Sequence, residues 1–270
     1  MTRWRLLETG ARPGAWNMAC DAALLASMHS GLESSRTPGG ATATLRLYGW
    51  EPAAVSLGHH QPDPSPGEIE WLRARGVDWV RRPTGGRAVY HGPPSEELTY
   101  SLVAAIDDPD LGTGLAACHL RIHAAIAAGL LRLGVSAGLA SRRRVALRPT
   151  SRRACFASSA PGEIAVDGRK LVGSAQRRTR RAFLQHGSIP LAGEQGVLAE
   201  VWPGCLEPER TTCVSSAAGR CVGFDELARA VVTAFEESMN VELAQGELSD
   251  EEILAIDTSL SASDSLRALA

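Results

Sequence analysis

Apolar residues at helical spacing mark four segments of the chain. Residues 15–29 place apolar side chains at three- and four-residue steps, and Asn17 can cap the start of a helix there. Residues 115–133 and 224–239 repeat this pattern over longer stretches, and residues 68–75 repeat it over a shorter one. The pattern therefore predicts four helices.

Shorter apolar or alternating runs predict strands between these helices. The runs cover residues 43–50, 53–57, 77–81, 95–106, 163–166, 170–174 and 183–190. A regular alternation of strand and helix is absent, so we expect an α/β (α+β) fold with a mixed β-sheet flanked by helices. Beyond residue 247 the sequence turns to Ser, Asp and Glu, which predicts one main domain over residues 1–247 and a C-terminal helix or loosely ordered tail over 248–270.

The composition is typical of a soluble cytoplasmic protein. A chain of 270 residues with 44% hydrophobic content can bury a full core. No apolar run reaches the roughly 18 residues that span a bilayer, and no apolar block follows the N-terminal arginines as in a signal peptide. Six cysteines are few for this length, which favours reduced thiols over disulfides. We expect no membrane attachment.

Basic residues are concentrated in one part of the chain. Residues 141–181 hold twelve Lys and Arg against two acidic residues, although the formal net charge of the whole chain is −2. Such a segment is either a solvated surface or a docking face for an acidic protein, and we expect no nucleic-acid partner. The candidate docking residues are Arg142, Arg143, Arg144, Arg177 and Arg178.

Lys170 is the only lysine among the 28 basic residues. An ammonium is a compact charge whose pKa burial can lower, so it supports acid–base chemistry that a guanidinium does not. Chance survival of one lysine is the alternative explanation. Lys170 is therefore the first candidate catalytic residue.

Cys155 lies fifteen residues before Lys170. A thiol reacts as the thiolate, and a neighbouring ammonium lowers the thiol's pKa, so such a pair suits thioester exchange. We expect the other cysteines to be small buried apolar residues. They are Cys20, Cys118, Cys205, Cys213 and Cys221.

Two further segments can present polar groups to a ligand. The N–H groups of Gly85 and Gly86 can bind an acyl carbonyl or a phosphate, although a glycine pair is also common in ordinary turns. His186 and Gly187 interrupt a strand-like run and can face a pocket, or His186 can be structural.

Histidines and cysteines also recur at regular intervals, which raises the question of a metal site. His119 and His123 lie four residues apart beside Cys118, and three later cysteines recur every eight residues. Neither set has the paired Cys-x-x-Cys spacing of a structural zinc site, so we expect no metal.

Six segments, in order over residues 15–190, together resemble the biotin/lipoate protein ligase superfamily and, within it, the cysteine octanoyltransferases of lipoate assembly. They are Asn17-Met18-Ala19-x-Asp21, Arg81-Arg82-Pro83-Thr84-Gly85-Gly86-Arg87-Ala88-Val89, Glu97-Leu98-Thr99-Tyr100-Ser101, Ala154-Cys155-Phe156, Gly168-Arg169-Lys170-Leu171-Val172-Gly173-Ser174-Ala175-Gln176 and Gln185-His186-Gly187-Ser188-Ile189. The resemblance implies the catalytic-domain fold of biotin synthetases and class II aminoacyl-tRNA synthetases. It also implies a reaction without a cofactor.

The resemblance further implies acyl transfer in two steps. Cys155 takes an octanoyl group from acyl carrier protein as a thioester, and a lysine of glycine cleavage H protein or of an E2 lipoyl domain opens it to an amide. Lys170 lowers the thiol's pKa and steadies the carbonyl oxygen, and the basic segment speeds encounter with acidic partner proteins. The substrate-binding residues implied are Arg82, Thr84, Gly85, Gly86, Arg87, Ala88, His91, Gly173, Ser174, Ala175, His186 and Gly187.

Two alternatives remain at this point. An ATP-dependent lipoate ligase on the same fold needs no cysteine, but such ligases usually carry a third glycine where Arg87 stands and an accessory domain. A non-catalytic acyl-carrier-binding protein would need neither Cys155 nor Lys170. The sequence leaves open whether the donor is acyl carrier protein or an octanoylated protein, and Gly92, in place of the family's usual Asp, leaves open the preferred chain length.

Overall fold

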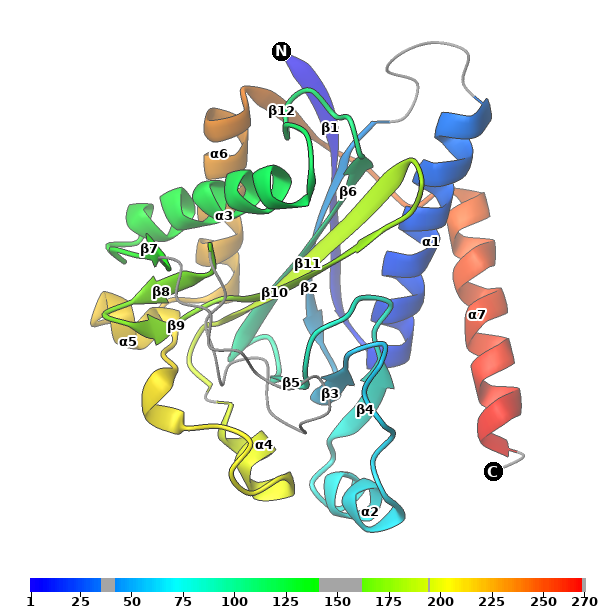
Figure 1. Ribbon diagram of the computed structural model, residues 1–270, viewed down its shortest axis with the longest axis vertical. Coiled ribbons are helices and arrows are strands. Elements are labelled where there is room, and N and C mark those ends of the chain that lie inside the picture. Colours follow the sequence, from blue (N-terminus) through cyan, green and yellow to red (C-terminus); the bar gives the residue numbers. More distant parts are fainter. Residues whose placement is uncertain (35–41, 141–161, 194, 269–270) are drawn as a thin grey trace.

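The computed structural model describes residues 1–34, 42–140, 162–193 and 195–268. Its centre is a six-stranded mixed β-sheet with helices on both faces (Figure 1). In sheet order the strands are β10 (Gly173–Arg178), β11 (Ala182–Pro190), β6 (Glu97–Ala105), β2 (Thr44–Trp50), β1 (Thr2–Arg12) and β12 (Val241–Gln245). β1 runs parallel to both of its neighbours, and the other pairs are antiparallel. The predicted mixed sheet flanked by helices is confirmed.

Two three-stranded sheets and several short helices complete the fold. One sheet joins β4 (Asp78–Arg81), β3 (Ala54–Leu57) and β5 (Val89–His91), and the other joins β7 (Gly138–Leu139), β8 (Ile164–Val166) and β9 (Arg169–Lys170). The short helices are α2 (Pro66–Ala74), α4 (Gly196–Val201), η2 (Pro208–Arg210) and α5 (Val214–Ala218).

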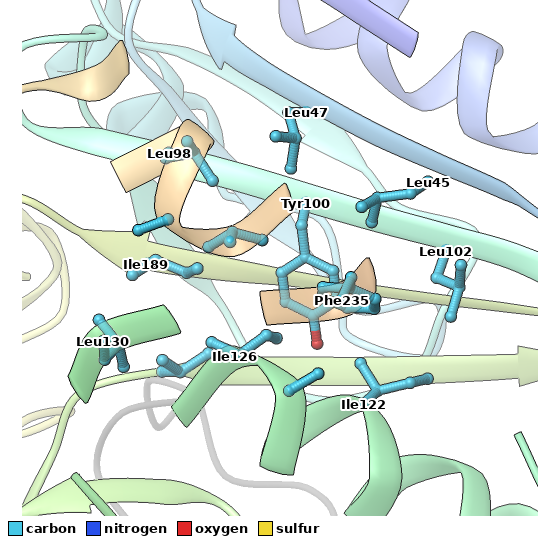
Figure 2. Close-up of a cluster of buried hydrophobic side chains, with 14 of the residues drawn as sticks. Leu45, Leu47, Leu98, Tyr100, Leu102, Ile122, Ile126, Leu130, Ile189 and Phe235 are labelled. Carbon is cyan, nitrogen blue, oxygen red and sulfur yellow. The ribbon is translucent and has the colours of Figure 1, made fainter. Parts of the chain in front are cut away.

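Helices α3 (Leu115–Arg132) and α6 (Phe224–Met239) cover one face of the large sheet. Their apolar sides meet the strands in the largest core cluster, and Figure 2 shows Tyr100 surrounded by leucines and isoleucines from strands and α3. The helices cross closely because Gly129 has no side chain: a Cβ there would lie 3.0 Å from the Ala230 carbonyl oxygen. Among the described residues, α3 is the one helix long and apolar enough to cross a bilayer, but its apolar side is buried in this core.

Helices α1 (Gly14–Ser34) and α7 (Asp250–Ala268) lie side by side on the opposite face (Figure 1). α1 packs Leu24 and Leu25 against the sheet, and α7 adds Ile256 to the same cluster. Arg5 of β1 binds the Glu252 carboxylate through two nitrogens, at 3.0 and 2.7 Å. The segment after residue 247 is thus helical and packed on α1, while its status as a separate unit stays a prediction.

The structure differs from the sequence prediction in several places. The predicted strand 170–174 is two strands, β9 and β10, because Leu171 and Val172 between them enter the main core. β1 and β12 were not predicted. Four of the five cysteines expected to be buried are buried, but Cys221 is exposed and that prediction is wrong.

Candidate functional site

A cavity that opens to solvent is lined by residues of both the large sheet and the small sheet β4-β3-β5. α1 contributes one side chain at its N-terminal end, and the remaining walls come from strands β2, β3, β5, β6, β10 and β11 and from the glycine-rich segment before β5. The lining residues are Met18, Tyr48, Trp50, Ser56, Arg82, Val89, His91, Thr99, Gly173, Ser174, Ala175, His186, Gly187 and Ser188.

Seven of the twelve residues predicted to bind substrate line this cavity, and their role in binding stays a prediction. They are Arg82, His91, Gly173, Ser174, Ala175, His186 and Gly187. The other five, Thr84, Gly85, Gly86, Arg87 and Ala88, are not among the lining residues. Thr84 contacts His186, the glycine-rich backbone holds Arg82, and Ala88 belongs to the core of the small sheet.

Arg82 fixes the glycine-rich segment in place. Its Nη2 donates to the carbonyl oxygens of Gly85 at 2.8 Å and Arg87 at 2.6 Å, and its Nη1 donates to the Ser56 carbonyl at 2.9 Å. Gly86 has φ +93°, a conformation that favours glycine. A side chain at Gly58 would collide with the Gly86 carbonyl oxygen, so the close approach of the two segments requires glycine.

Asp21 of α1 is fully buried beneath the cavity. Its carboxylate accepts from Arg46 Nη1 at 2.8 Å and from Ser101 Oγ at 2.8 Å, and it contacts His186 Nδ1 at 2.8 Å. Burial alone would raise the pKa of Asp21, but the hydrogen bond with His186 and the charge of Arg46 lower this pKa below its usual value. Burial also lowers the pKa of His186, which keeps the imidazole neutral and directed at Thr84 Oγ1, 2.6 Å away.

A second histidine, His91, lies on the cavity wall. Its Nε2 is 2.8 Å from Ser56 Oγ and its Nδ1 is 2.7 Å from Glu97 Oε1. Its ring stacks on Trp50, with centroids 3.9 Å apart and an interplanar angle of 13°. Glu97 also accepts from Thr99 Oγ1 at 2.6 Å.

Ser174 connects the cavity with the core under α3. Its Oγ lies 2.8 Å from Tyr100 Oη and 2.8 Å from His123 Nε2, and His123 Nδ1 is 2.7 Å from the Gly162 carbonyl oxygen. Since a carbonyl only accepts, His123 carries its proton on Nδ1 and accepts from Ser174. Burial, followed by the nearby His119, lowers the pKa of His123 to about 3.

Lys170 is buried on β9, and its Nζ lies 2.6 Å from Glu163 Oε1. Cys155 lies outside the described residues, so the expected contact between Cys155 and Lys170 stays a prediction. The same holds for the docking residues Arg142, Arg143 and Arg144.

The two remaining docking candidates are on β10. Arg177 is exposed, and its Nη1 donates to the Pro83 carbonyl at 3.3 Å. Arg178 is half-buried, and its guanidinium carbon lies 5.4 Å from the centroid of the Phe183 ring.

Seven lining residues were missed by the sequence analysis. Four of them belong to segments that carried the resemblance, so a signal for them existed: Met18, Val89, Thr99 and Ser188. Trp50 and Ser56 lie on strands without any motif, and only the packing of the two sheets brings them to the cavity. The seventh is Tyr48 on β2. Within the described part of the chain, no three His, Cys, Asp or Glu side chains are close enough to hold a metal ion.

Comparison with known proteins shows which family the chain is similar to. The model of the lipoyl protein ligase A/B catalytic domain matches residues 13–236. Octanoyltransferase LipM of Kyrpidia tusciae is 37% identical over 93% of this chain and 93% of its own length. The protein of the same name from Symbiobacterium thermophilum is 37% identical over 93% of this chain and 92% of its own.

The fold is also that of a solved relative. The crystal structure of lipoate-protein ligase A bound with ATP superposes with a TM-score of 0.74 at 22% identity, covering 95% of this chain and 94% of that one. The family match and the two relatives lead to one conclusion: the chain belongs to the lipoyl protein ligase A/B catalytic domain family and is an acyltransferase.

Proposed function

We propose that the chain transfers an octanoyl group from octanoyl-acyl carrier protein to a lysine of a lipoyl-accepting protein, through a thioester on Cys155, in cytoplasmic protein lipoylation. The acceptor is glycine cleavage H protein or an E2 lipoyl domain. The observation that carries the proposal is the 37% identity, over nearly the whole chain, to proteins named octanoyltransferase.

The cavity supports an acyl substrate. Met18, Val89 and Ala175 offer apolar contacts. The Ser188 hydroxyl is buried in the lining and has no hydrogen-bond partner within the described residues, so it can donate to a polar atom of the ligand.

Lys170 supports the thioester chemistry. Its ammonium is buried, so its charge acts in a low-dielectric environment and stabilises a neighbouring anion strongly. Glu163 balances that charge in the absence of substrate. We propose that Lys170 lowers the pKa of the Cys155 thiol and stabilises the oxyanion formed when the thioester is attacked.

The test separates loading from the rest of the reaction. The purified chain is incubated with octanoyl-acyl carrier protein without ATP, and intact masses are recorded. Wild type should gain one octanoyl group that hydroxylamine removes, and Cys155→Ala should gain none. Cys221→Ala is the matched control, because Cys221 is exposed and would collect any non-specific acylation.

Two results would contradict the proposal. An adduct that persists in Cys155→Ala and disappears in Cys221→Ala would place the reactive thiol elsewhere. Acylation of a lipoyl domain only when ATP and free octanoate are supplied would identify the chain as a ligase.

A further inference from the structure

Two arrays of hydroxyl, imidazole and carboxylate converge on the cavity. The first is Ser56–His91–Glu97, with contacts of 2.8 and 2.7 Å. The second is Thr84–His186–Asp21, with contacts of 2.6 and 2.8 Å. The order of groups is that of a general-base array, in which a carboxylate orients an imidazole toward a hydroxyl.

Every proton in the first array can be assigned from its partners. The Glu97 carboxylate only accepts, so His91 Nδ1 and Thr99 Oγ1 both donate to it. His91 Nε2 is therefore a free acceptor in the neutral imidazole, and Ser56 donates to it. Arg82 Nη1 donates to Ser56 Oγ at 3.1 Å, which fixes the direction of the Ser56 hydroxyl.

The two arrays differ in how their carboxylates are balanced. Asp21 forms an ion pair with the fully buried Arg46, so its charge is already compensated. Among the contacts described, Glu97 receives hydrogen bonds from His91 and Thr99 and no ion pair from an arginine or lysine. A proton arriving on His91 therefore creates an ion pair with Glu97, whereas a proton on His186 would compete with Arg46 for Asp21.

The two arrays also differ in whether their hydroxyl group lines the cavity. Ser56 and His91 are both lining residues, while Thr84 is fully buried behind His186. The stacked Trp50 ring holds the His91 plane and is favourably placed for an imidazolium. Only the first array presents its hydroxyl to a ligand.

We propose that Ser56, His91 and Glu97 form the proton relay that deprotonates the attacking lysine amine in the second half of the acyl transfer. This inference rests on the proposed function, because it needs an acyl thioester in the cavity. Ser56 contacts the amine, His91 receives the proton, and Glu97 is a positioning residue that stabilises the imidazolium.

The acceptor lysine enters as the neutral amine, having left one proton in water. As its nitrogen forms the C–N bond, an N–H proton passes to Ser56 Oγ while the Ser56 proton passes to His91 Nε2. The C–S bond breaks with its electron pair on the Cys155 sulfur, and the imidazolium then releases its proton to water.

A comparison of nucleophiles tests the relay. Acyl-enzyme is loaded from octanoyl-acyl carrier protein and chased with n-butylamine or n-butanethiol, which match in size. A thiol attacks as the thiolate and has lost its proton beforehand, so its reaction needs no base. A saturating lipoyl domain is used in parallel, so that kcat is read separately from KM.

Ser56→Ala and His91→Gln should load normally and keep the thiol chase, while the amine chase and the kcat with lipoyl domain fall about 100-fold, the lower range for general-base catalysis. Ser101→Ala is the matched control. It removes another buried serine hydroxyl that bonds a carboxylate network, outside the cavity, and both chases should stay at the wild-type rate.

The outcomes that overturn the relay are distinct from those that overturn the function. If amine and thiol chases fall in parallel, the array only maintains the architecture of the cavity. If the amine chase is unchanged in both variants, another group is the base. If wild type itself never loads from octanoyl-acyl carrier protein, the proposed function fails, and the relay with it.

Discussion

Asp21 and Arg46 form an ion pair that water does not reach, since both side chains are fully buried. Removing one partner of such a pair leaves the other charge uncompensated. We expect Asp21→Asn to lower the free energy of unfolding by about 3–5 kcal/mol, measured by urea denaturation. Asp63→Asn is the control, because the Asp63 side chain is exposed where it pairs with Arg81, and it should cost less than about 1 kcal/mol. Equal costs would contradict the assignment.

Because the pKa of Asp21 is lowered by folding, the free energy of unfolding depends on pH. Asp21 binds a proton less readily in the folded state, so its contribution is present above the pKa of the unfolded carboxyl and is lost as pH falls toward the folded pKa. The acid limb of the wild-type stability curve should therefore be shallower in Asp21→Asn.

His123 works in the same sense as Asp21. The folded state keeps it neutral down to a pKa of about 3, whereas in the unfolded chain it binds a proton below its usual value of 6.5. Acid therefore favours unfolding. Relative to His123→Gln, wild type should lose about 2 kcal/mol of stability between pH 7 and pH 5, measured by urea denaturation at both pH values. A constant difference between the two proteins would show that the pKa of His123 is the same in the folded and the unfolded state.

Gly187 determines the spacing of strands β10 and β11 at the cavity. A Cβ at this position would lie 2.6 Å from Tyr100 Cε1 and 3.0 Å from the Gly173 carbonyl oxygen. Gly187→Ala should therefore cost about 1–3 kcal/mol and slow octanoyl loading. Gly67→Ala in α2 is the control, because nothing lies within 4 Å of its Cβ position, and it should leave both quantities unchanged or slightly raise stability.

Ile256 connects helix α7 to the rest of the fold. It is buried against α1, while Ile253 in the same helix is exposed. Ile256→Ala should cost about 2–5 kcal/mol and Ile253→Ala close to nothing, by thermal or urea unfolding. Equal effects would mean that α7 does not dock through this face.

Sequence periodicity identified the elements whose apolar pattern is strong and local. α3 and α6 were predicted within two residues because each presents one apolar side to the sheet. β1 was missed because its burial does not alternate regularly along Thr2–Arg12, and β12 because it is short. Both strands depend on pairing between residues more than 230 positions apart, which no local pattern records.

At the scale of the whole molecule, the residues of the cavity could also be predicted only where they belong to local motifs. The glycine-rich segment and the His186–Gly187 pair are motifs, so they could be proposed from sequence. Trp50 and Ser56 acquire their role only when the small sheet packs beside the large one. The Ser56–His91–Glu97 array spans β3, β5 and β6, and its order in the chain gives no sign of it.

The charge of the molecular surface affects the binding of partner proteins. Arg177 is exposed on β10, beside the cavity-lining Gly173–Ala175. If an acidic carrier protein docks there, Arg177→Glu should raise KM for octanoyl-acyl carrier protein and weaken its dependence on ionic strength, while kcat stays near wild type. Arg3→Glu is the control, since Arg3 is an exposed arginine on β1 without a place in the cavity. Equal changes in both would indicate a general charge effect.

The parallel pairing of β1 with β12 affects folding during synthesis on the ribosome. β1 emerges before β2, which can pair with one of its edges early. Among the described strands, the partner of its other edge is β12, whose residues 241–245 leave the exit tunnel more than 230 residues later. Until then that edge is open to pairing with other chains, so slow translation of the codons between the two strands prolongs the interval in which a nascent chain needs a chaperone.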